Sequence, residues 1–454
     1  MMYELLLPQV ADIMNADMLG PENYRLITRV STDTRSLQPG DLYVALRGER
    51  FDGHAFAAQA LQQGAVAVVV DHPLEVSGPQ LLVNDTLEAL SRLAAWRRRE
   101  FEGPVVGITG SSGKTTVKQL MASVLEQRYR TWMTQGNLNN HIGVPLTLLG
   151  LSPEYKAAVI EMGASGVGEI DATARLVKPS VAILTNASDS HLQGFGSLQG
   201  VVSTKGELLD HISEWGTAVL NADDPHFDDW QWRARDREIL SFGLSEEADV
   251  SARDIHTSLD GVQFTLQTPD FSCAIQLPLL GRHNVLNALA VAAAAIAVGL
   301  NQEEIRQGLN SAQAFDGRLQ WHRGQGGIRL LDDSYNANPA SVRAAIDVLA
   351  DAERGWLVLG DMGELGEQAL AAHQNIGAYA KQRGIHALLG CGELSKAAVA
   401  AMDSDASQHF NSQTELLTYL QQHTQAGDVV LVKGSRSAAM DQVVRALQLG
   451  DEDN

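Results

Sequence analysis

The stretch Gly107-Ile108-Thr109-Gly110-Ser111-Ser112-Gly113-Lys114-Thr115-Thr116 decides the fold class, because it is a glycine-rich loop between an apolar run and a helical pattern. Residues 104–108 are predicted to form a short buried strand, and apolar residues recur at helical spacing after residue 115. Turn N–H groups and a helix N-terminus that point at one place form a cradle for phosphate. Lys114 can reach terminal phosphates, and the Thr115 hydroxyl can hold magnesium. Ile108 stands where the general pattern has its first glycine, so the loop is a compact variant.

The length of the chain is enough for about three domains, and its composition is that of a globular protein. Of the 454 residues, 44% are apolar and 20% charged, and the net charge of −21 argues against nucleic-acid binding. Only Cys273 and Cys391 are present, so neither a disulfide framework nor a zinc cluster is expected, and a reducing compartment fits. Residues 1–10 do not resemble a signal peptide, and no apolar run is long enough to span a bilayer. We therefore expect a cytoplasmic protein with no membrane insertion.

Strand and helix patterns alternate in three blocks, which we place at residues 1–102, 103–313 and 314–454. Strands separated by helices predict mostly parallel sheets, so the fold class is α/β. The expected strands are 41–46 and 65–70 in the first block, 105–108, 157–160, 181–184 and 217–220 in the second, and 328–331, 356–359, 387–389 and 429–432 in the third. The expected helices include 55–63, 284–299 and 302–312.

Polar side chains follow the strands of the middle block, where ligands bind in open parallel sheets. Glu161 directly follows one predicted strand, and His191 comes shortly after the next. A carboxylate at a strand end is suited to magnesium, although it can also be a solvated loop acid. A histidine in a loop is more often part of the polar surface, and only its position favours a functional role for His191.

Further residues allow more than one interpretation each. Lys205 opens a predicted helix, where a surface lysine is the ordinary expectation. Arg318 lies at the join between the second and third blocks and could close over a transferring phosphate, cap a helix or pair with an acid. The segment Asp332–Pro339 holds acids and asparagines that could cap a helix or reach a nucleotide.

Together these segments resemble the Mur ligase family, whose members add amino acids to the peptide stem of the bacterial cell-wall precursor. The matching segments, in chain order, are 109–116, 161–163, 185–186, 191–196, 205–207, 221–224, 281–288 and 315–318. The resemblance covers nearly the whole chain. It implies a small α/β UDP-binding domain, a central P-loop ATPase-like domain with a parallel sheet, and a C-terminal Rossmann-like domain.

Within the family, the segment Asp332–Pro339 is the discriminating one. Its sequence resembles that of the member that joins D-alanyl-D-alanine to UDP-N-acetylmuramoyl-tripeptide, as do residues 360–366 and 433–436. The Asp-Asn-Pro-Arg segment of the diaminopimelate-adding member does not occur in this sequence. Residues 31–35 resemble the family's UDP-binding turn. Either diaminopimelate or lysine could be the third residue of the tripeptide.

The resemblance also implies the ligands and the residues that bind them. ATP and two magnesium ions are the implied cofactors, UDP-N-acetylmuramoyl-tripeptide and D-alanyl-D-alanine are the substrates, and we expect a monomer. The implied catalytic residues are Lys114, Glu161, His191, Lys205 and Arg318, and the implied magnesium ligands are Thr115, Glu161, His191 and a carbamylated Lys205. The implied nucleotide-binding residues are Gly110, Ser111, Ser112, Gly113, Lys114, Thr115, Thr116, Asn284, Asn287, Arg318, Asp333 and Asn336, and the implied substrate-binding residues are Ser31, Thr32, Asp33, Thr34, Arg35, Lys433, Ser435 and Arg436.

The expected chemistry is activation of a carboxylate by ATP. A carboxylate and an amine do not condense spontaneously in water, so the tripeptide carboxylate first becomes an acyl phosphate that the amine of the dipeptide attacks. Closure of the third block would complete the site and exclude water.

Three other classes of protein fit the sequence less well than a Mur ligase. A folate polyglutamylating ligase shares the middle-domain pattern, but the first block and residues 332–339 argue against it. A GTPase switch would need an Asn-Lys-x-Asp segment, which the sequence lacks. A nucleotide-binding protein without activity would not need the intact set of Lys114, Thr115, Glu161, His191 and Lys205.

Overall fold

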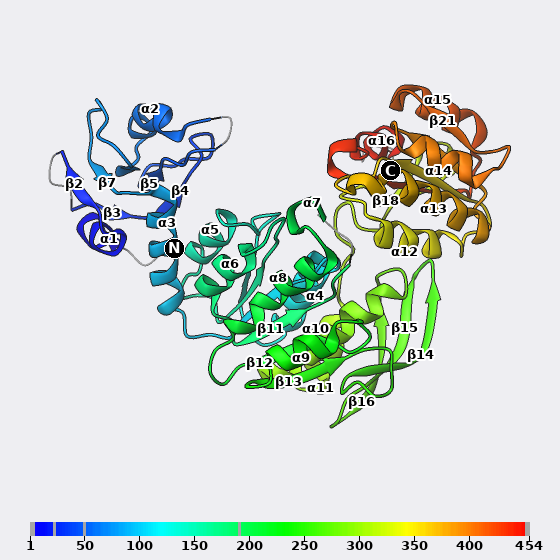
Figure 1. The fold of residues 1–454 in the computed structure, drawn as a ribbon, viewed down its shortest axis with the longest axis horizontal. Helices are drawn as coiled ribbons and strands as arrows, with labels where there is room; N and C mark the ends of the chain where they lie inside the picture. Colours follow the sequence, from blue (N-terminus) through cyan, green and yellow to red (C-terminus); the bar gives the residue numbers. More distant parts are fainter. Residues whose placement is uncertain (1–4, 21–23, 49–50, 189–191, 450–454) are drawn as a thin grey trace.

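Three α/β lobes follow one another in chain order in the computed structural model, which describes residues 5–20, 24–48, 51–188 and 192–449 (Figure 1). Each lobe has a sheet of its own, and the parallel sheet of the middle lobe lies between the other two lobes (Figure 1). The predicted α/β class with a central parallel sheet is confirmed. No helix of the described residues is long and apolar enough to cross a membrane.

The N-terminal lobe has a five-stranded sheet in the order β2-β7-β6-β5-β4, in which only β2 is antiparallel. Its elements are β1 (Leu5–Leu6), α1 (Leu7–Met14), β2 (Asp17–Leu19), β3 (Leu26–Ile27), β4 (Arg29–Ser31), β5 (Asp41–Val44), η1 (Gly53–Phe56), α2 (Ala57–Gln62), β6 (Ala67–Val70), β7 (Gln80–Leu82) and α3 (Thr86–Arg99). The strands expected at 41–46 and 65–70 are present but shorter. The strands of two or three residues, such as β4, are too short to show a periodic pattern in the sequence.

The middle lobe contains a six-stranded, fully parallel sheet in the order β13-β12-β11-β8-β10-β9. Its elements up to the sheet edge are β8 (Val105–Thr109), α4 (Lys114–Leu125), β9 (Thr131–Met133), α5 (Gly143–Leu149), β10 (Ala157–Glu161), α6 (Glu169–Val177), β11 (Val181–Leu184), α7 (Leu192–Phe195), α8 (Leu198–Asp210), β12 (Thr217–Asn221), α9 (Phe227–Arg233) and β13 (Glu238–Phe242). Because β8 lies between β10 and β11, the loops after these three strands meet at one edge of the sheet.

The rest of the middle lobe is an antiparallel sheet and two helices, namely β14 (Ser251–Ser258), β15 (Gly261–Gln267), β16 (Ser272–Leu277), α10 (His283–Val298) and α11 (Gln302–Asn310). The sequence analysis assigns no element to residues 251–277. The signal is nevertheless present, because residues of β16 alternate between exposed and buried. Helix α10 confirms the helix predicted at 284–299, and its small, buried alanine side chains pack in one core with α4.

The C-terminal lobe has a six-stranded sheet in the order β17-β18-β22-β19-β20-β21, parallel except at the edge strand β17. Its elements are β17 (Gln320–Arg323), η2 (Gln325–Gly327), β18 (Arg329–Asp333), α12 (Pro339–Leu349), β19 (Gly355–Gly360), η3 (Gly366–Gln368), α13 (Ala369–Gln382), β20 (Ala387–Cys391), α14 (Ser395–Met402), β21 (Gln408–Phe410), α15 (Gln413–His423), β22 (Val429–Lys433), η4 (Arg436–Ala438) and α16 (Asp441–Leu447). The carboxyl ends of β18 and β22 are neighbours, so Asp333 and Lys433 lie side by side.

Candidate active site

The phosphate loop spans residues 110–113 between β8 and α4, as the sequence predicts. Gly110 has a φ of +150° and Gly113 a φ of +80°. A Cβ atom on Gly110 would lie 1.9 Å from Thr185 Oγ1, and one on Gly113 would lie 2.6 Å from Asn287 Oδ1. Glycine is therefore required at both positions, by backbone conformation and by close packing.

The turn after β11 holds the phosphate loop in shape. The backbone N–H and the hydroxyl of Ser112 donate to Asn186 Oδ1 at 3.0 and 3.1 Å, and the Thr185 hydroxyl donates to Ser112 O at 2.7 Å. The Ser111 N–H donates to Asn186 O at 2.9 Å. These bonds fix the loop before any ligand binds.

The side chain of Lys114 folds back over the phosphate loop. Its ammonium donates to Gly110 O at 2.6 Å and to Ser111 O at 3.4 Å. Burial lowers the pKa of Lys114, the carboxylate of Glu161 opposes this shift, and the guanidinium of Arg318 adds to it. The ammonium is thus placed at the mouth of the phosphate cradle.

Glu161 ends β10 and is only 2% exposed. Its Oε1 accepts hydrogen bonds from Asn139 Nδ2 at 2.8 Å and from Thr115 Oγ1 at 3.3 Å. Its Oε2 lies 3.5 Å from Lys118 Nζ and has no hydrogen-bond partner among the described residues. A buried carboxylate oxygen without a hydrogen bond, beside a threonine hydroxyl, is the hard oxygen donor set that suits magnesium.

Lys205 is buried in α8 with only 1% of its surface exposed, so it is not the surface lysine that its position alone suggests. Its Nζ lies 5.4 Å from the ring centre of Phe195. Burial and the nearby charge of Lys114 lower the pKa of Lys205 to about 7. His191, predicted beside it, lies outside the described residues.

The C-terminal lobe contributes Arg318 to the phosphate loop. Its Nη2 donates to Thr115 Oγ1 at 3.1 Å, and its guanidinium carbon lies 4.6 Å from the ring centre of Tyr335. A cation over an aromatic face is held in position by the ring quadrupole. Arg318 therefore connects the first residues of the C-terminal lobe to the start of α4 in the middle lobe.

A buried ion pair lies at the carboxyl ends of β18 and β22. Lys433 Nζ is 2.5 Å from Asp333 Oδ2 and donates to Asn336 O at 2.9 Å. This pair fixes the turn that carries Asn336.

Helix α10 begins against the phosphate loop. Asn287 Nδ2 donates to Asn284 Oδ1 at 2.8 Å, and Asn284 Nδ2 donates to Leu280 O at 2.8 Å. Burial, with the nearby Lys433, lowers the pKa of His283 to about 4, so this imidazole is neutral at pH 7.

A cavity of about 1090 Å³ lies between the middle and C-terminal lobes and brings most of the predicted residues together. The predicted residues that line it are Ser111, Ser112, Gly113, Lys114, Thr115, Thr116, Glu161, Asn284, Asn287, Arg318, Asp333, Asn336, Lys433, Ser435 and Arg436. Gly110 and Lys205 do not line it, although Lys205 is close enough for Lys114 to affect its pKa.

The predicted turn of Ser31, Thr32, Asp33, Thr34 and Arg35 lies in the N-terminal lobe and does not line this cavity. It follows β4, and Asp33 Oδ2 accepts from Arg35 Nη2 at 2.6 Å. Hydrogen bonds from Arg35 lower the pKa of Asp33 to about 2. The turn is thus a separate feature of another lobe, with an ion pair of its own.

Sequence reasoning missed Asn139, Lys118 and Tyr335 as site residues. Asn139 and Lys118 contact the two carboxylate oxygens of Glu161, and Tyr335 lies against Arg318. A signal for Asn139 exists in the asparagine-rich segment 137–140 after β9. Lys118 gave none, because a lysine in the first turns of a helix is usually exposed.

Each of the three lobes contains a segment that matches a domain of one protein family. Residues 26–98 match "Mur ligase family, catalytic domain", residues 108–295 match "Mur ligase middle domain", and residues 317–436 match "Mur ligase, glutamate ligase domain". The chain therefore belongs to the Mur ligase family.

Several individual proteins of this family are similar to the chain over nearly its whole length. UDP-N-acetylmuramoyl-tripeptide–D-alanyl-D-alanine ligase of Escherichia coli is 46% identical and covers 98% of this chain and 99% of its own length. The protein of the same name from Bacillus subtilis is 34% identical over 96% of this chain and 97% of its own length. A crystal structure of MurF from Acinetobacter baumannii superposes with a TM-score of 0.93 at 35% identity over 98% of this chain and 99% of that one. MurF ligase from Thermotoga maritima in complex with ADP has a TM-score of 0.83 at 29% identity and covers 92% of this chain and 96% of its own.

Proposed function

We propose that the chain is an ATP-dependent ligase that joins D-alanyl-D-alanine to UDP-N-acetylmuramoyl-tripeptide, with release of ADP and phosphate. One observation carries this proposal. The phosphate loop, Glu161 and Arg318 line one cavity with Lys433 and Ser435 of the C-terminal lobe. A nucleotide held by the middle lobe and a substrate held by the C-terminal lobe would therefore meet there.

ATP would bind with its phosphates in the loop. Lys114 and the N–H groups at the start of α4 would face the β- and γ-phosphates, and the fixed positive dipole of the helix end would favour their charge. Asn284 and Asn287, at the start of α10, would contact the adenine, and Asp333 and Asn336 would reach the ribose from the C-terminal lobe. Their common lining of the cavity supports these roles.

Thr115 and Glu161 would hold one magnesium ion, because their oxygens are 3.3 Å apart and Glu161 Oε2 has no hydrogen-bond partner among the described residues. When bound, magnesium supplies positive charge that reduces the repulsion between the γ-phosphate and an incoming carboxylate. A second ion would use His191 and a carbamylated Lys205.

Carbamylation of Lys205 is supported by its burial and by the pKa of about 7, which leaves a large share of the amine neutral at pH 7. The nitrogen lone pair attacks the carbon of carbon dioxide, and the nitrogen loses one proton to solvent. The product is an anion with two hard oxygens. The repulsion between Lys205 and Lys114 then becomes an attraction.

The reaction would proceed in two steps. The tripeptide carboxylate attacks the γ-phosphorus while the bond to the β-phosphate oxygen breaks, and Arg318 stabilises the charge of the transferring group. The neutral amine of the dipeptide then attacks the acyl carbon, its nitrogen loses one proton to solvent, and phosphate leaves with the former carboxylate oxygen. The N-terminal turn 31–35 would hold the UDP group, and Lys433, Ser435 and Arg436 the peptide end. We also propose that the enzyme works as a cytoplasmic monomer.

Isotope transfer tests this route. A tripeptide whose terminal carboxylate carries ¹⁸O should give one labelled oxygen in the released phosphate and a UDP-linked pentapeptide as the product, both measured by mass spectrometry. Pentapeptide formed with unlabelled phosphate would contradict the acyl phosphate. Absence of pentapeptide with all three substrates present would contradict the proposed function itself.

A further inference from the structure

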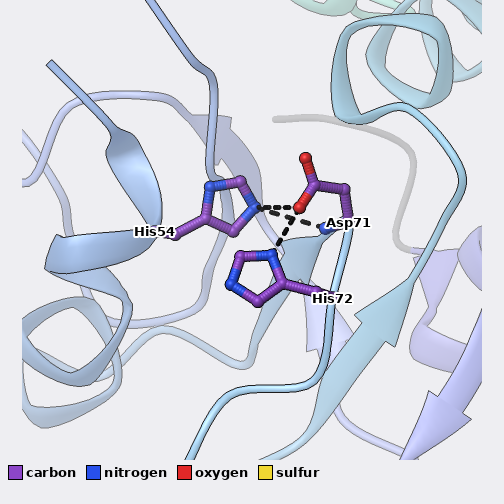
Figure 2. Close-up of side chains that lie close together, drawn as sticks. All are labelled: His54, Asp71 and His72. Atoms are coloured by element: carbon purple, nitrogen blue, oxygen red, sulfur yellow. Dashed lines mark hydrogen bonds and ion pairs between the residues drawn. The ribbon is translucent and has the colours of Figure 1, made fainter.

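A second group of chemically active side chains lies in the N-terminal lobe, far along the chain from the phosphate loop. His54 lies in η1 after β5, and Asp71 and His72 directly follow β6. Strands β5 and β6 are parallel neighbours, so their carboxyl ends meet at one edge of the sheet. Figure 2 shows the two imidazole rings and the carboxylate of Asp71 turned toward one another.

The three side chains place their donor atoms close together. Asp71 Oδ1 lies 2.6 Å from His72 Nδ1 and 3.2 Å from His54 Nε2, and one donor atom of each residue lies within 4.8 Å of the other two (Figure 2). The imidazole rings are stacked with centres 4.8 Å apart. His54 is buried, whereas the side chain of His72 is 48% exposed, so solvent can reach the group.

The hydrogen bonds of His54 fix its tautomer. A carboxylate can only accept, so His54 Nδ1–H donates to Asp52 Oδ1 at 2.6 Å. His54 Nε2 then carries a lone pair, which accepts from the Asp71 backbone N–H at 3.2 Å. The lone-pair atoms His54 Nε2 and Asp71 Oδ1 consequently face each other at 3.2 Å, an arrangement that a cation between them would stabilise.

We propose that His54, Asp71 and His72 form a binding site for one divalent cation of the zinc class. The ligands would be His54 Nε2, Asp71 Oδ1 and His72 Nδ1, and the metal would displace the hydrogen bond that the Asp71 backbone N–H donates to His54 Nε2. Asp52 would act behind the site by holding the ring of His54, as carboxylates do for metal-binding histidines. Three protein ligands leave a fourth position for water.

One of the donor distances is already close to that of a tetrahedral ion. Metal–ligand bonds of about 2.0–2.2 Å place the ligand atoms of a tetrahedral site about 3.3–3.6 Å apart. The distance of 3.2 Å between His54 Nε2 and Asp71 Oδ1 is just below this range. His72 has to retreat slightly from Asp71 when the metal replaces its shared proton, and its exposed side chain is free to do so. Two imidazole nitrogens select zinc, cobalt or nickel over magnesium, which prefers oxygen.

Arg47 is the competing cation at this site. Its Nη2 lies 3.1 Å from Asp71 Oδ1 and its Nε 3.3 Å from Asp52 Oδ2. A metal ion would replace the guanidinium at Asp71, while Asp52 continues to pair with Arg47. After this exchange Asp71 faces the metal ion and Asp52 faces Arg47, so each carboxylate still has a cation beside it.

This site lies outside the cavity between the middle and C-terminal lobes, whose lining contains none of these residues. The inference goes beyond the proposed ligase activity and does not depend on it. A metal here would tie the segment after β5 to the segment after β6, within the lobe that carries the 31–35 turn.

Zinc binding to the full-length protein tests the proposal, with competition against a chromophoric chelator, excess magnesium and neither nucleotide nor substrate. We expect the wild type and the exposed-histidine control His256→Ala to bind one zinc ion more than His72→Ala. Asp52→Asn should keep the site with affinity about 10- to 100-fold weaker, and Arg47→Gln should bind more tightly. His72→Ala is the main variant because His72 is half-exposed, and its melting temperature without metal should match that of the wild type.

Cobalt gives a second readout in the same samples. The absorption of cobalt bound to histidine and carboxylate in four-coordinate geometry should appear in the wild type and in His256→Ala, and should be lost in His72→Ala. Equal zinc stoichiometry and equal cobalt spectra in all three proteins would overturn the proposal. Because no substrate is present, this outcome would leave the ligase function untouched.

Discussion

The burial of Lys205 determines its chemistry. An ammonium group with 1% exposure is costly to keep charged, which is why its pKa falls to about 7 although the charges of Glu169 and Glu207 oppose the shift. The same amine in solvent would be almost fully protonated at neutral pH and would react far more slowly with carbon dioxide.

Replacement of Lys205 by alanine should abolish turnover, and small carboxylates such as acetate should restore part of it, because they can supply the missing oxygens. The measurement is the rate of pentapeptide formation with and without acetate. Lys396→Ala, which removes an exposed lysine, is the matched control and should keep the wild-type rate.

Two results would count against this role. Wild-type turnover in Lys205→Ala would exclude Lys205 from the reaction. Loss of turnover without rescue, in a variant that melts like the wild type, would contradict the carbamate.

At the same scale, sequence reasoning reached the residues whose position follows from a strand end or from the loop. Glu161 and Lys114 are of this kind, and the cavity lining contains both. The contacts that position them come from residues distant in sequence. Asn139 reaches Glu161 across 22 positions, and Arg318 reaches Thr115 across 203. A single sequence can point to such residues one by one, but it does not show which of them contact each other.

At the scale of elements, the start of α10 links the two lobes that form the cavity. His283 is its first residue, and its pKa is lowered to about 4 by burial and by Lys433 of the C-terminal lobe. Between about pH 4 and pH 6.5 the unfolded chain binds a proton at this histidine and the folded chain does not. The folded state therefore loses stability as the pH falls through this window.

Replacement of His283 by glutamine should reduce this loss by up to about 3 kcal/mol, since one pKa unit corresponds to about 1.4 kcal/mol. Urea unfolding of the full-length protein, with the transition of the middle lobe followed from pH 7 down to about pH 4, measures the change in the free energy of unfolding. His256→Gln removes an exposed histidine and should follow the wild type. Equal losses in all three proteins would contradict the account of His283.

The elements themselves were predictable where the pattern was long. Strands buried on both faces, such as Val105–Thr109 and Val429–Lys433, show as apolar runs, and α10 shows as a long alanine-rich segment. The edge strand β9 has only three residues, so it could be recognised only from its pairing with β10. The sheet β14–β16 could be recognised only from the alternation of exposed and buried residues. The boundaries after residues 102 and 313 stay predictions.

At the scale of the whole molecule, the cavity depends on how the C-terminal lobe sits on the middle lobe. Trp321 Nε1 donates to Leu259 O at 3.0 Å, and Arg318 donates to Thr115 across the same junction. Both contacts come from the first residues of the C-terminal lobe, close to the connection. Rotation about this connection would bring Asp333 and Lys433 toward or away from the phosphate loop.

Binding of an ATP analogue together with UDP-N-acetylmuramoyl-tripeptide should close the lobes and reduce the radius of gyration, because both lobes then contact the same ligands. Small-angle X-ray scattering of the full-length protein, with and without the two ligands, measures it. Identical scattering curves would contradict lobe closure.

The most direct measurement of the central claim is phosphate release from ATP as a function of which substrates are present. We predict sustained release only when UDP-N-acetylmuramoyl-tripeptide and D-alanyl-D-alanine are both present, with one pentapeptide formed for each phosphate. Sustained release with either substrate alone, or with GTP and no acceptor, would contradict the account.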